Sequence, residues 1–100
     1  MKVHELKLDD VYFNDVRDGK KTFEIRKNDR DFEEGDLLAL SRYKDGSYCY
    51  WNFFSKFHNS DIHNADTLLM LVTYVTDYEQ KDGYVVMGIS PLIPNEAEDD

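Results

Sequence analysis

Hydrophobic and polar residues alternate along much of this chain, which is the pattern of strands that bury one face. The stretch 3–8 alternates in this way, and the stretch 37–43 is apolar on both parities at its start, as in a strand covered on both sides. Six strands are predicted, over residues 3–8, 22–27, 37–43, 47–51 or as far as 54, 67–76 and 84–90. The pattern therefore predicts a mostly β protein, a small β-barrel or strongly curved sheet of about six strands with short helices.

One helix is predicted directly after the first strand. Tyr12, Phe13 and Val16 fall at i, i+1 and i+4, which places them on one apolar stripe. Asp9 or Asp10 is expected to cap its start, because a carboxylate accepts hydrogen bonds from the free N–H groups of the first turn. Gly19 is expected to end it, since glycine readily adopts the left-handed conformation found after many helices. A helix this short persists only by packing on the sheet, so it should close one side of the barrel.

Two of the connections between strands have clear sequence signals. The pair Asp45-Gly46 is typical of a tight hairpin turn. Residues 28–36 read as a polar loop with Phe32 as its apolar anchor. Residues 55–66 lack a steady period and are rich in Asn, Asp, Ser and His, so they are predicted to form a loop that contains at most a helical turn.

Length and composition indicate a single domain, which we assign to residues 1–93. Residues 94–100 contain four acidic residues and no basic one, and are predicted to be a disordered acidic tail. No apolar run is long enough to span a membrane, and no export signal is expected at the start. The single cysteine, Cys49, is expected to be a buried, inert thiol, which suits a cytoplasmic protein.

Although the net charge of the chain is −9, residues 17–30 form a basic block. That window holds six basic and three acidic residues, a net +3, whereas the other 86 residues hold six basic and eighteen acidic ones, a net −12. The overall charge argues against tight, nonspecific binding to nucleic acid. It permits a small local anion site, because salt screens charges beyond about 8–10 Å.

The basic block surrounds the predicted strand 22–27. Phe23 and Ile25 alternate with polar residues and are expected to face the core, which leaves Thr22, Glu24 and Arg26 on the other face. Arginine and lysine donors beside a carboxylate form a candidate site for a phosphate. The alternative is an ordinary ion pair on a solvated strand face.

Other chemically able residues give weaker signals. His58 and His63 lie near two aspartates, but their spacing fits no recognised metal site, so neither a metal nor another cofactor is predicted. His4 is expected to be a hydrogen-bonded structural residue. An aromatic cluster comprises Tyr48, Tyr50, Trp51, Phe53 and Phe54. These rings either stack nucleic-acid bases or form the core and edge of a strand.

Residues 19–26, Gly-Lys-Lys-Thr-Phe-Glu-Ile-Arg, resemble the Gly-x-Lys-x-x-Glu-x-Arg signature of ASCH (activating-signal-cointegrator homology) domains, whose fold is PUA-like. The flanking stretches look like a small bacterial and phage family of unknown function within that superfamily. Those stretches are residues 4–7, 12–13, 26–32, 35–36 and 83–89. The resemblance covers residues 3–43 and 68–90. It implies a β-barrel with a cleft lined by the signature, a cleft proposed in the superfamily to hold RNA or a modified nucleoside.

Carried over position by position, the resemblance implies that Lys21, Glu24 and Arg26 line the cleft and that Gly19 shapes the approach to it. The full predicted ligand-binding set is Gly19, Lys20, Lys21, Thr22, Glu24, Arg26 and Arg30. The similar amidohydrolases that act on acetylated cytidine have a threonine where this chain has Glu24, which argues against their chemistry here. Residues 52–66 look longer than in near relatives, and are expected either to cover the cleft or to extend a partner surface.

Three functions follow from these observations. The preferred hypothesis is a module that binds RNA or a nucleotide, in which Lys21 and Arg26 hold a phosphate and Glu24 orients a base edge or a ribose hydroxyl. The second is a metal-independent ribonuclease or other nucleoside-modifying hydrolase with Lys21, Glu24 and Arg26 as catalytic residues and Glu24 as the general base. The third is a protein-interaction module that uses the acidic surface and segment 52–66. A membrane is not expected as a partner.

Overall fold

The computed structural model describes residues 1–54 and 56–92, and it is mostly β with one short helix, as the sequence predicts. The elements in chain order are β1 (Val3–Asp9), α1 (Asp10–Arg17), β2 (Phe23–Lys27), β3 (Leu37–Lys44), β4 (Ser47–Asn52), β5 (Lys56–Asn59), β6 (Thr67–Thr76) and β7 (Tyr84–Pro91). The predicted tail at residues 94–100 lies outside the described residues.

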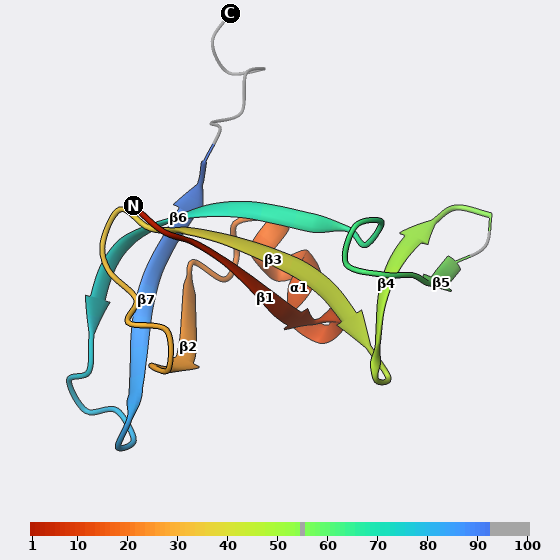
Figure 1. Ribbon diagram of the computed structural model, residues 1–100. Coiled ribbons are helices and arrows are strands. Elements are labelled where there is room, and N and C mark those ends of the chain that lie inside the picture. Colours follow the sequence, from red (N-terminus) through yellow and green to blue (C-terminus); the bar gives the residue numbers. More distant parts are fainter. Residues whose placement is uncertain (55, 93–100) are drawn as a thin grey trace, which may run out of the picture.

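The strands form one curled sheet in the order β2-β7-β6-β3-β4-β5, with each neighbouring pair antiparallel. β1 pairs in parallel with β3, on the edge of β3 that β6 does not occupy. Figure 1 shows the sheet arching over α1, with β4 and β5 standing out from one end as a two-stranded hairpin. The result is a half-barrel that is closed neither at β5 nor between β1 and β2.

The hydrophobic core lies between the inner face of this arch and the helix. Alternate residues of β1, β3, β6 and β7 supply most of it, which is why the predicted strands read as alternating or doubly apolar. The buried cluster comprises Leu6, Leu8, Phe13, Val16, Phe32, Leu38, Leu40, Met70, Val72, Val85, Met87 and Ile89. Phe32 therefore anchors the loop before β3, as the sequence predicts.

The helix begins as expected but presents a narrower apolar stripe. Asp9 is the N-cap, and its Oδ1 accepts a hydrogen bond of 3.1 Å from the N–H of Val11. Phe13 and Val16 are buried, whereas Tyr12 is 49% exposed, so its predicted place in the stripe is wrong. Adjacent helix positions are about 100° apart, and two turns cover too little sheet to bury both residues of such a pair.

The prediction that residues 55–66 form a loop is wrong in part, because Lys56–Asn59 form β5 and pair with β4. All four residues of β5 are exposed, so this edge strand carries no alternation of buried and exposed positions. A four-residue strand without a buried face has no periodic signal in the sequence. The Asp45-Gly46 turn is confirmed, with Tyr43 and Tyr48 paired across the hairpin that it connects.

His4 is a structural residue, as predicted, and its buried partner is Asp36. The His4 Nε2 and Asp36 Oδ2 atoms lie 2.9 Å apart, and both side chains are almost fully buried. Asp36 also accepts hydrogen bonds of 3.0 Å from the backbone N–H groups of Lys2 and Glu33. Burial alone would raise the pKa of Asp36, but the bonds from His4, Lys2 and Glu33 outweigh it and lower the pKa from 3.8 to about 2.

This lowered pKa predicts a loss of stability in acid. The folded protein takes up the Asp36 proton near pH 2 and the unfolded chain near 3.8, so the contribution of Asp36 is complete above about pH 4 and is lost as the pH falls towards 2. Urea midpoints of the wild type and the Asp36→Asn variant, measured from about pH 5 to about pH 2, should converge at the acid end. A gap that stays constant over this range would contradict the assignment.

Cys49 is buried with 1% exposure, and burial raises the pKa of its thiol, so it is an inert core residue. No helix in the described part of the chain is long and apolar enough to cross a membrane.

Candidate ligand-binding cleft

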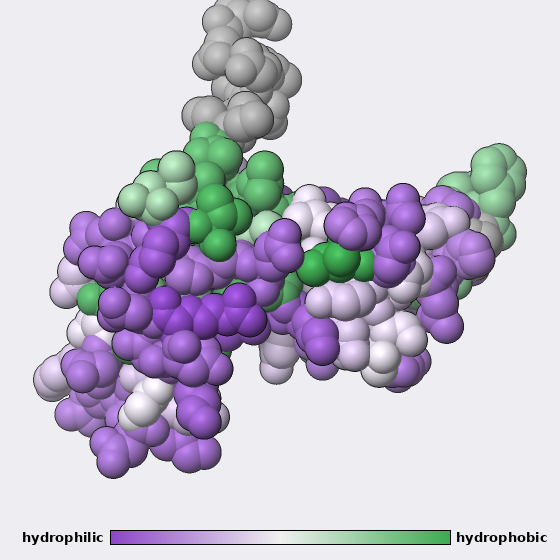
Figure 2. Space-filling model, viewed as in Figure 1, coloured by the Kyte–Doolittle hydropathy of each residue, from purple (hydrophilic) through white to green (hydrophobic). Residues whose placement is uncertain are grey.

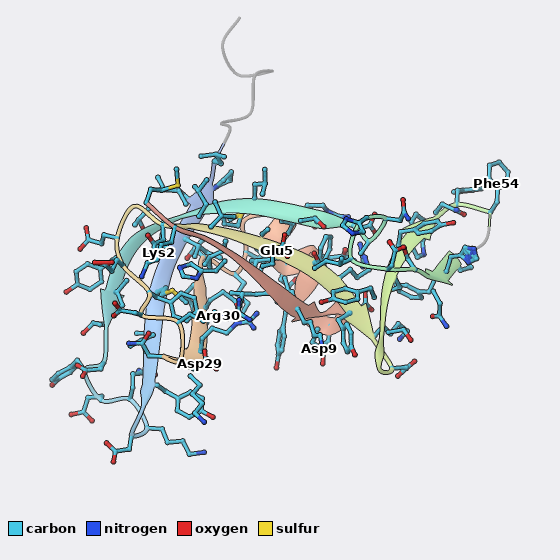
Figure 3. All side chains as sticks on the ribbon, in the orientation of Figure 1. Lys2, Glu5, Asp9, Asp29, Arg30 and Phe54 are labelled. Atoms are coloured by element: carbon cyan, nitrogen blue, oxygen red, sulfur yellow. The ribbon has the colours of Figure 1, made fainter. Side chains whose placement is uncertain are left out.

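The sheet leaves a gap between β1 and β2, the two strands on either side of α1 in the sequence. Within residues 1–54 and 56–92, β1 pairs only with β3, and β2 pairs only with β7. Side chains bridge the gap where backbone pairing would otherwise close it. Arg26 Nη2 donates to the carbonyl of Lys7 over 2.9 Å, and Arg30 Nη1 donates to the carbonyl of Glu5 over 3.0 Å. Figure 3 shows Arg30 beneath β1, close to Glu5.

β2 forms where predicted, but its two faces are reversed. Glu24 is only 3% exposed, whereas Phe23 and Ile25 are 42% and 50% exposed, so the prediction that Phe23 and Ile25 face the core is wrong. The cross-strand partner of Glu24 is Met87, and directly opposite residues of an antiparallel pair share a face. The Glu24 carboxylate therefore points to the core side of the sheet, where two basic side chains pair with it.

Those partners are Lys21 and Arg26. Lys21 Nζ lies 2.7 Å from Glu24 Oε1, and Arg26 Nε lies 2.8 Å from Glu24 Oε2. The Lys21 and Arg26 side chains are 18% and 22% exposed, so both cations still reach solvent. A buried carboxylate with one cation on each oxygen is satisfied, and it fixes both cations in position.

The three residues border a hollow of about 500 Å³. It is lined by Lys7, Leu8 and Asp9 of β1, Tyr12 of α1, Lys21, and Phe23, Glu24, Ile25 and Arg26 of β2. Three basic and two acidic side chains give this lining a net charge of +1. Lys21 Nζ lies 5.4 Å from the centre of the Tyr12 ring and 4.7 Å from that of Phe23, so two aromatic rings flank the cation. We call this hollow the β1–β2 cleft.

The structure brings together three of the predicted ligand-binding residues, Lys21, Glu24 and Arg26, in this lining. The others, Gly19, Lys20, Thr22 and Arg30, do not line the cleft. Gly19 adopts the left-handed conformation, with φ of +78°, in the turn that leads from α1 to Lys21. Sequence reasoning missed the contributions of β1 and Tyr12, and no local pattern marks them, since they belong to the cleft only because β1 ends beside β2.

Lys21 and Arg26 have hydrogen-bond donors to spare. Lys21 Nζ also donates to the carbonyl of Phe23 over 2.7 Å, which leaves one of its three protons unused. Arg26 Nη1 has no hydrogen-bond partner in the described part of the chain. Both oxygens of Glu24 accept a bond from a cation, so the carboxylate fixes Lys21 and Arg26 in position.

Segment 52–66 does not cover the cleft, because none of its described residues belongs to the lining. Its described residues form the outer part of the projecting hairpin and the turn back to β6. Among residues 1–54 and 56–92, no three His, Cys, Asp or Glu side chains gather as a metal-ion site would require.

Fold and site together define a class: a small half-barrel protein with a charged, partly aromatic cleft where its sheet fails to close. The chain belongs to the family described as "Domain of unknown function (DUF3850)", which it matches over residues 3–89. It is also similar to the "Uncharacterized 12.9 kDa protein in GpA 3'region" of Escherichia phage P2, with 47% identity over 47 residues. That match covers 47% of this chain and only 43% of the phage protein.

Proposed function

We propose that the β1–β2 cleft binds a phosphate-bearing nucleotide or the phosphate of an RNA strand. The observation that carries this proposal is the fixed pair of cations, Lys21 and Arg26, on either side of the buried Glu24. Guanidinium and ammonium groups form short, charge-assisted hydrogen bonds with phosphate oxygens. Because Glu24 already holds both cations, little side-chain entropy remains to be lost when a phosphate binds.

The rest of the lining suits the remainder of a nucleotide. Tyr12 and Phe23 are half-exposed, and aromatic rings at such positions stack bases of any sequence. The hollow of about 500 Å³ falls within the range of small-molecule sites. The net charge of +1 attracts an anion locally in a chain whose total charge is −9.

The resemblance of residues 19–26 to the ASCH signature supports the same assignment. In that superfamily the equivalent cleft is proposed to hold RNA or a modified nucleoside, and here the signature residues Lys21, Glu24 and Arg26 line the cleft. As part of this proposal, we place the family among the PUA-like ASCH proteins.

Calorimetric titration with uridine monophosphate, uridine and inorganic phosphate tests the proposal. The monophosphate should bind saturably. Uridine should bind at least about tenfold more weakly, because it lacks the phosphate that Lys21 and Arg26 recognise. Equal affinities for uridine and its monophosphate, or no binding of either, would remove the proposed function.

The same samples separate binding from catalysis. Incubation of end-labelled RNA with the protein and a chelator should leave the RNA intact, because the proposed role of Glu24 is to hold Lys21 and Arg26 in position. Cleavage that disappears in the Glu24→Gln variant would instead establish the ribonuclease alternative.

A further inference from the structure

An aromatic track leads away from the β1–β2 cleft along the β3–β4–β5 ribbon. Tyr43 and Tyr48 are directly opposite in the β3–β4 pair, and Tyr50 and His58 are directly opposite in the β4–β5 pair. Opposite residues share a face, and so do Tyr48 and Tyr50, which are two residues apart on one strand. These four rings therefore lie on one face of the ribbon, in two pairs separated by roughly 6.5–7 Å.

Each pair of rings is braced. The ring centres of Tyr43 and Tyr48 are 5.2 Å apart and those of Tyr50 and His58 are 5.1 Å apart, both edge to face. The three tyrosines are partly exposed and His58 is exposed, so the rings are held by the ribbon without being buried in the core. A preorganised ring loses little side-chain entropy when a flat ligand stacks on it.

Lys7 connects the track to the cleft. Lys7 is one of the residues that line the cleft, and its Nζ lies 4.7 Å from the centre of the Tyr43 ring and 5.8 Å from that of Tyr48. At the other end, Lys56 is paired with Asn52, two residues beyond Tyr50, and its Nζ lies 5.8 Å from the centre of the Phe53 ring. The track thus has an ammonium group at each end.

Few exposed cations lie beside the track. Residues 41–60 hold three basic residues and one acidic residue. Arg42 is buried and paired with Asp10 and Asp66, and Lys44 lies 4.0 Å from Asp45, which leaves Lys56 together with Lys7 of β1. Figure 2 shows the hairpin extending from a mostly hydrophilic body to a hydrophobic end.

A polar hollow lies beside the track. It has a volume of about 820 Å³ and is lined by Tyr50, Asn59, Ser60, Asp61, Asn64 and Asp66. Amide and carboxylate groups of this kind hydrogen-bond the edges of bases, while the adjacent ring supplies the stacking surface. Its acidic groups disfavour a phosphate within the hollow, so a strand would place a base there and keep its backbone outside.

From these observations we propose that the face of the β3–β4–β5 ribbon carrying Tyr43, Tyr48, Tyr50 and His58 is a stacking platform for single-stranded RNA. The strand enters at the β1–β2 cleft, passes Lys7 and continues towards Lys56. This inference builds on the proposed function, but it assigns a separate surface and a polymeric partner. The repeat of the ring pairs is comparable to the spacing of bases in an extended single strand, and the cationic ends favour a polyanion over an apolar protein surface.

The test is fluorescence anisotropy with labelled oligouridylates of two, four and eight nucleotides, alongside uridine monophosphate as competitor. Wild-type affinity should rise at least tenfold from the dinucleotide to the octanucleotide. Tyr50→Ala should abolish most of this rise and leave uridine monophosphate binding unchanged, because Tyr50 does not line the β1–β2 cleft. Tyr50→Phe should retain it, since it keeps the ring. Tyr78→Ala, at a 75% exposed tyrosine beyond β6, is the matched control and should change nothing.

His58→Ala provides a second variant at an exposed edge position, in case Tyr50→Ala disturbs the hairpin, and should weaken octanucleotide binding about threefold. Octanucleotide affinity equal to that of the dinucleotide, or unchanged in both Tyr50→Ala and His58→Ala, would overturn the platform. The platform would also be overturned if a protein bound to this surface in a Tyr50-dependent way while no oligonucleotide bound to it. Failure of the monophosphate to bind, with length-dependent binding still sensitive to Tyr50, would remove the cleft function and leave the platform.

Discussion

Replacement of Arg42 by alanine is expected to lower the free energy of unfolding by about 3 kcal/mol. Arg42 is 4% exposed, and its guanidinium joins three parts of the chain. Nε donates to Asp66 Oδ2 over 2.8 Å, Nη1 pairs with Asp10, and the group lies 4.0 Å from the centre of the Phe13 ring. Alanine would leave the two carboxylates close together in a half-buried site without a counter-charge.

The expected loss lies at the low end of the range for a broken buried ion pair, because Asp10 and Asp66 are 18% and 34% exposed and water can partly hydrate them. Urea denaturation followed by circular dichroism measures this loss directly. Arg42→Lys keeps the charge but not the planar fork, so it should lose roughly half as much. An alanine variant within about 0.5 kcal/mol of the wild type would show that the network does not hold α1 and the turn before β6 against β3.

Replacement of Arg26 by alanine is expected to weaken uridine monophosphate binding about 50-fold. The variant loses one of the two cations fixed on Glu24, together with the hydrogen bond from Nη2 to the carbonyl of Lys7. The variant therefore lacks one hydrogen-bond donor to the phosphate and one hydrogen bond across the gap between β1 and β2. Stability should fall by about 2 kcal/mol as well, because Glu24 keeps only Lys21 as a partner.

Lys27→Ala is the matched control for this effect. Lys27 is the next residue of β2, is exposed, does not line the cleft, and its removal changes the net charge by the same amount. Its variant should bind the monophosphate within about twofold of the wild type, since a surface charge outside the site acts only through a screened field. Equal weakening in the two variants would mean that the anion responds to overall charge and has no site at Arg26.

Much of the framework could be predicted from the sequence, because it depends on local periodicity and turn chemistry. β6 occupies the predicted residues, β1 and β3 each extend one residue further, and Asp9 caps the helix as expected. These features need only alternation, an N-cap and the Asp45-Gly46 turn. Lys21, Glu24 and Arg26 could be named as candidate site residues because they are close together in the basic block and match the signature.

The buried face of β2 could not be predicted from local periodicity. Alternation in Phe23, Glu24 and Ile25 establishes that the strand has two different faces, but the tertiary structure decides which face is buried. Glu24 is buried because Lys21 and Arg26 neutralise it in the gap beside β1, and Phe23 and Ile25 then form part of the cleft wall. The alternation assigns Phe23 and Ile25 to the core, whereas in the structure both line the β1–β2 cleft.

The pairings between distant charged groups could not be predicted either. Arg42 and Asp66 are 24 positions apart, and His4 and Asp36 are 32 apart, so each pair exists only after the strands have assembled. Nothing in a local window distinguishes Arg42 from the exposed basic residues around it. The short edge strand β5 was missed for the related reason that its place is set by pairing with β4 and not by a buried face.

The β1–β2 cleft is the proposed phosphate site, and amide NMR during a titration with uridine monophosphate tests this assignment most directly. The resonances of residues 7–9, 12 and 21–26 should shift together and saturate, with a single dissociation constant that matches calorimetry. Shifts confined to other parts of the protein, or no saturable shift at concentrations where calorimetry detects binding, would contradict the assignment of this cleft as the phosphate site.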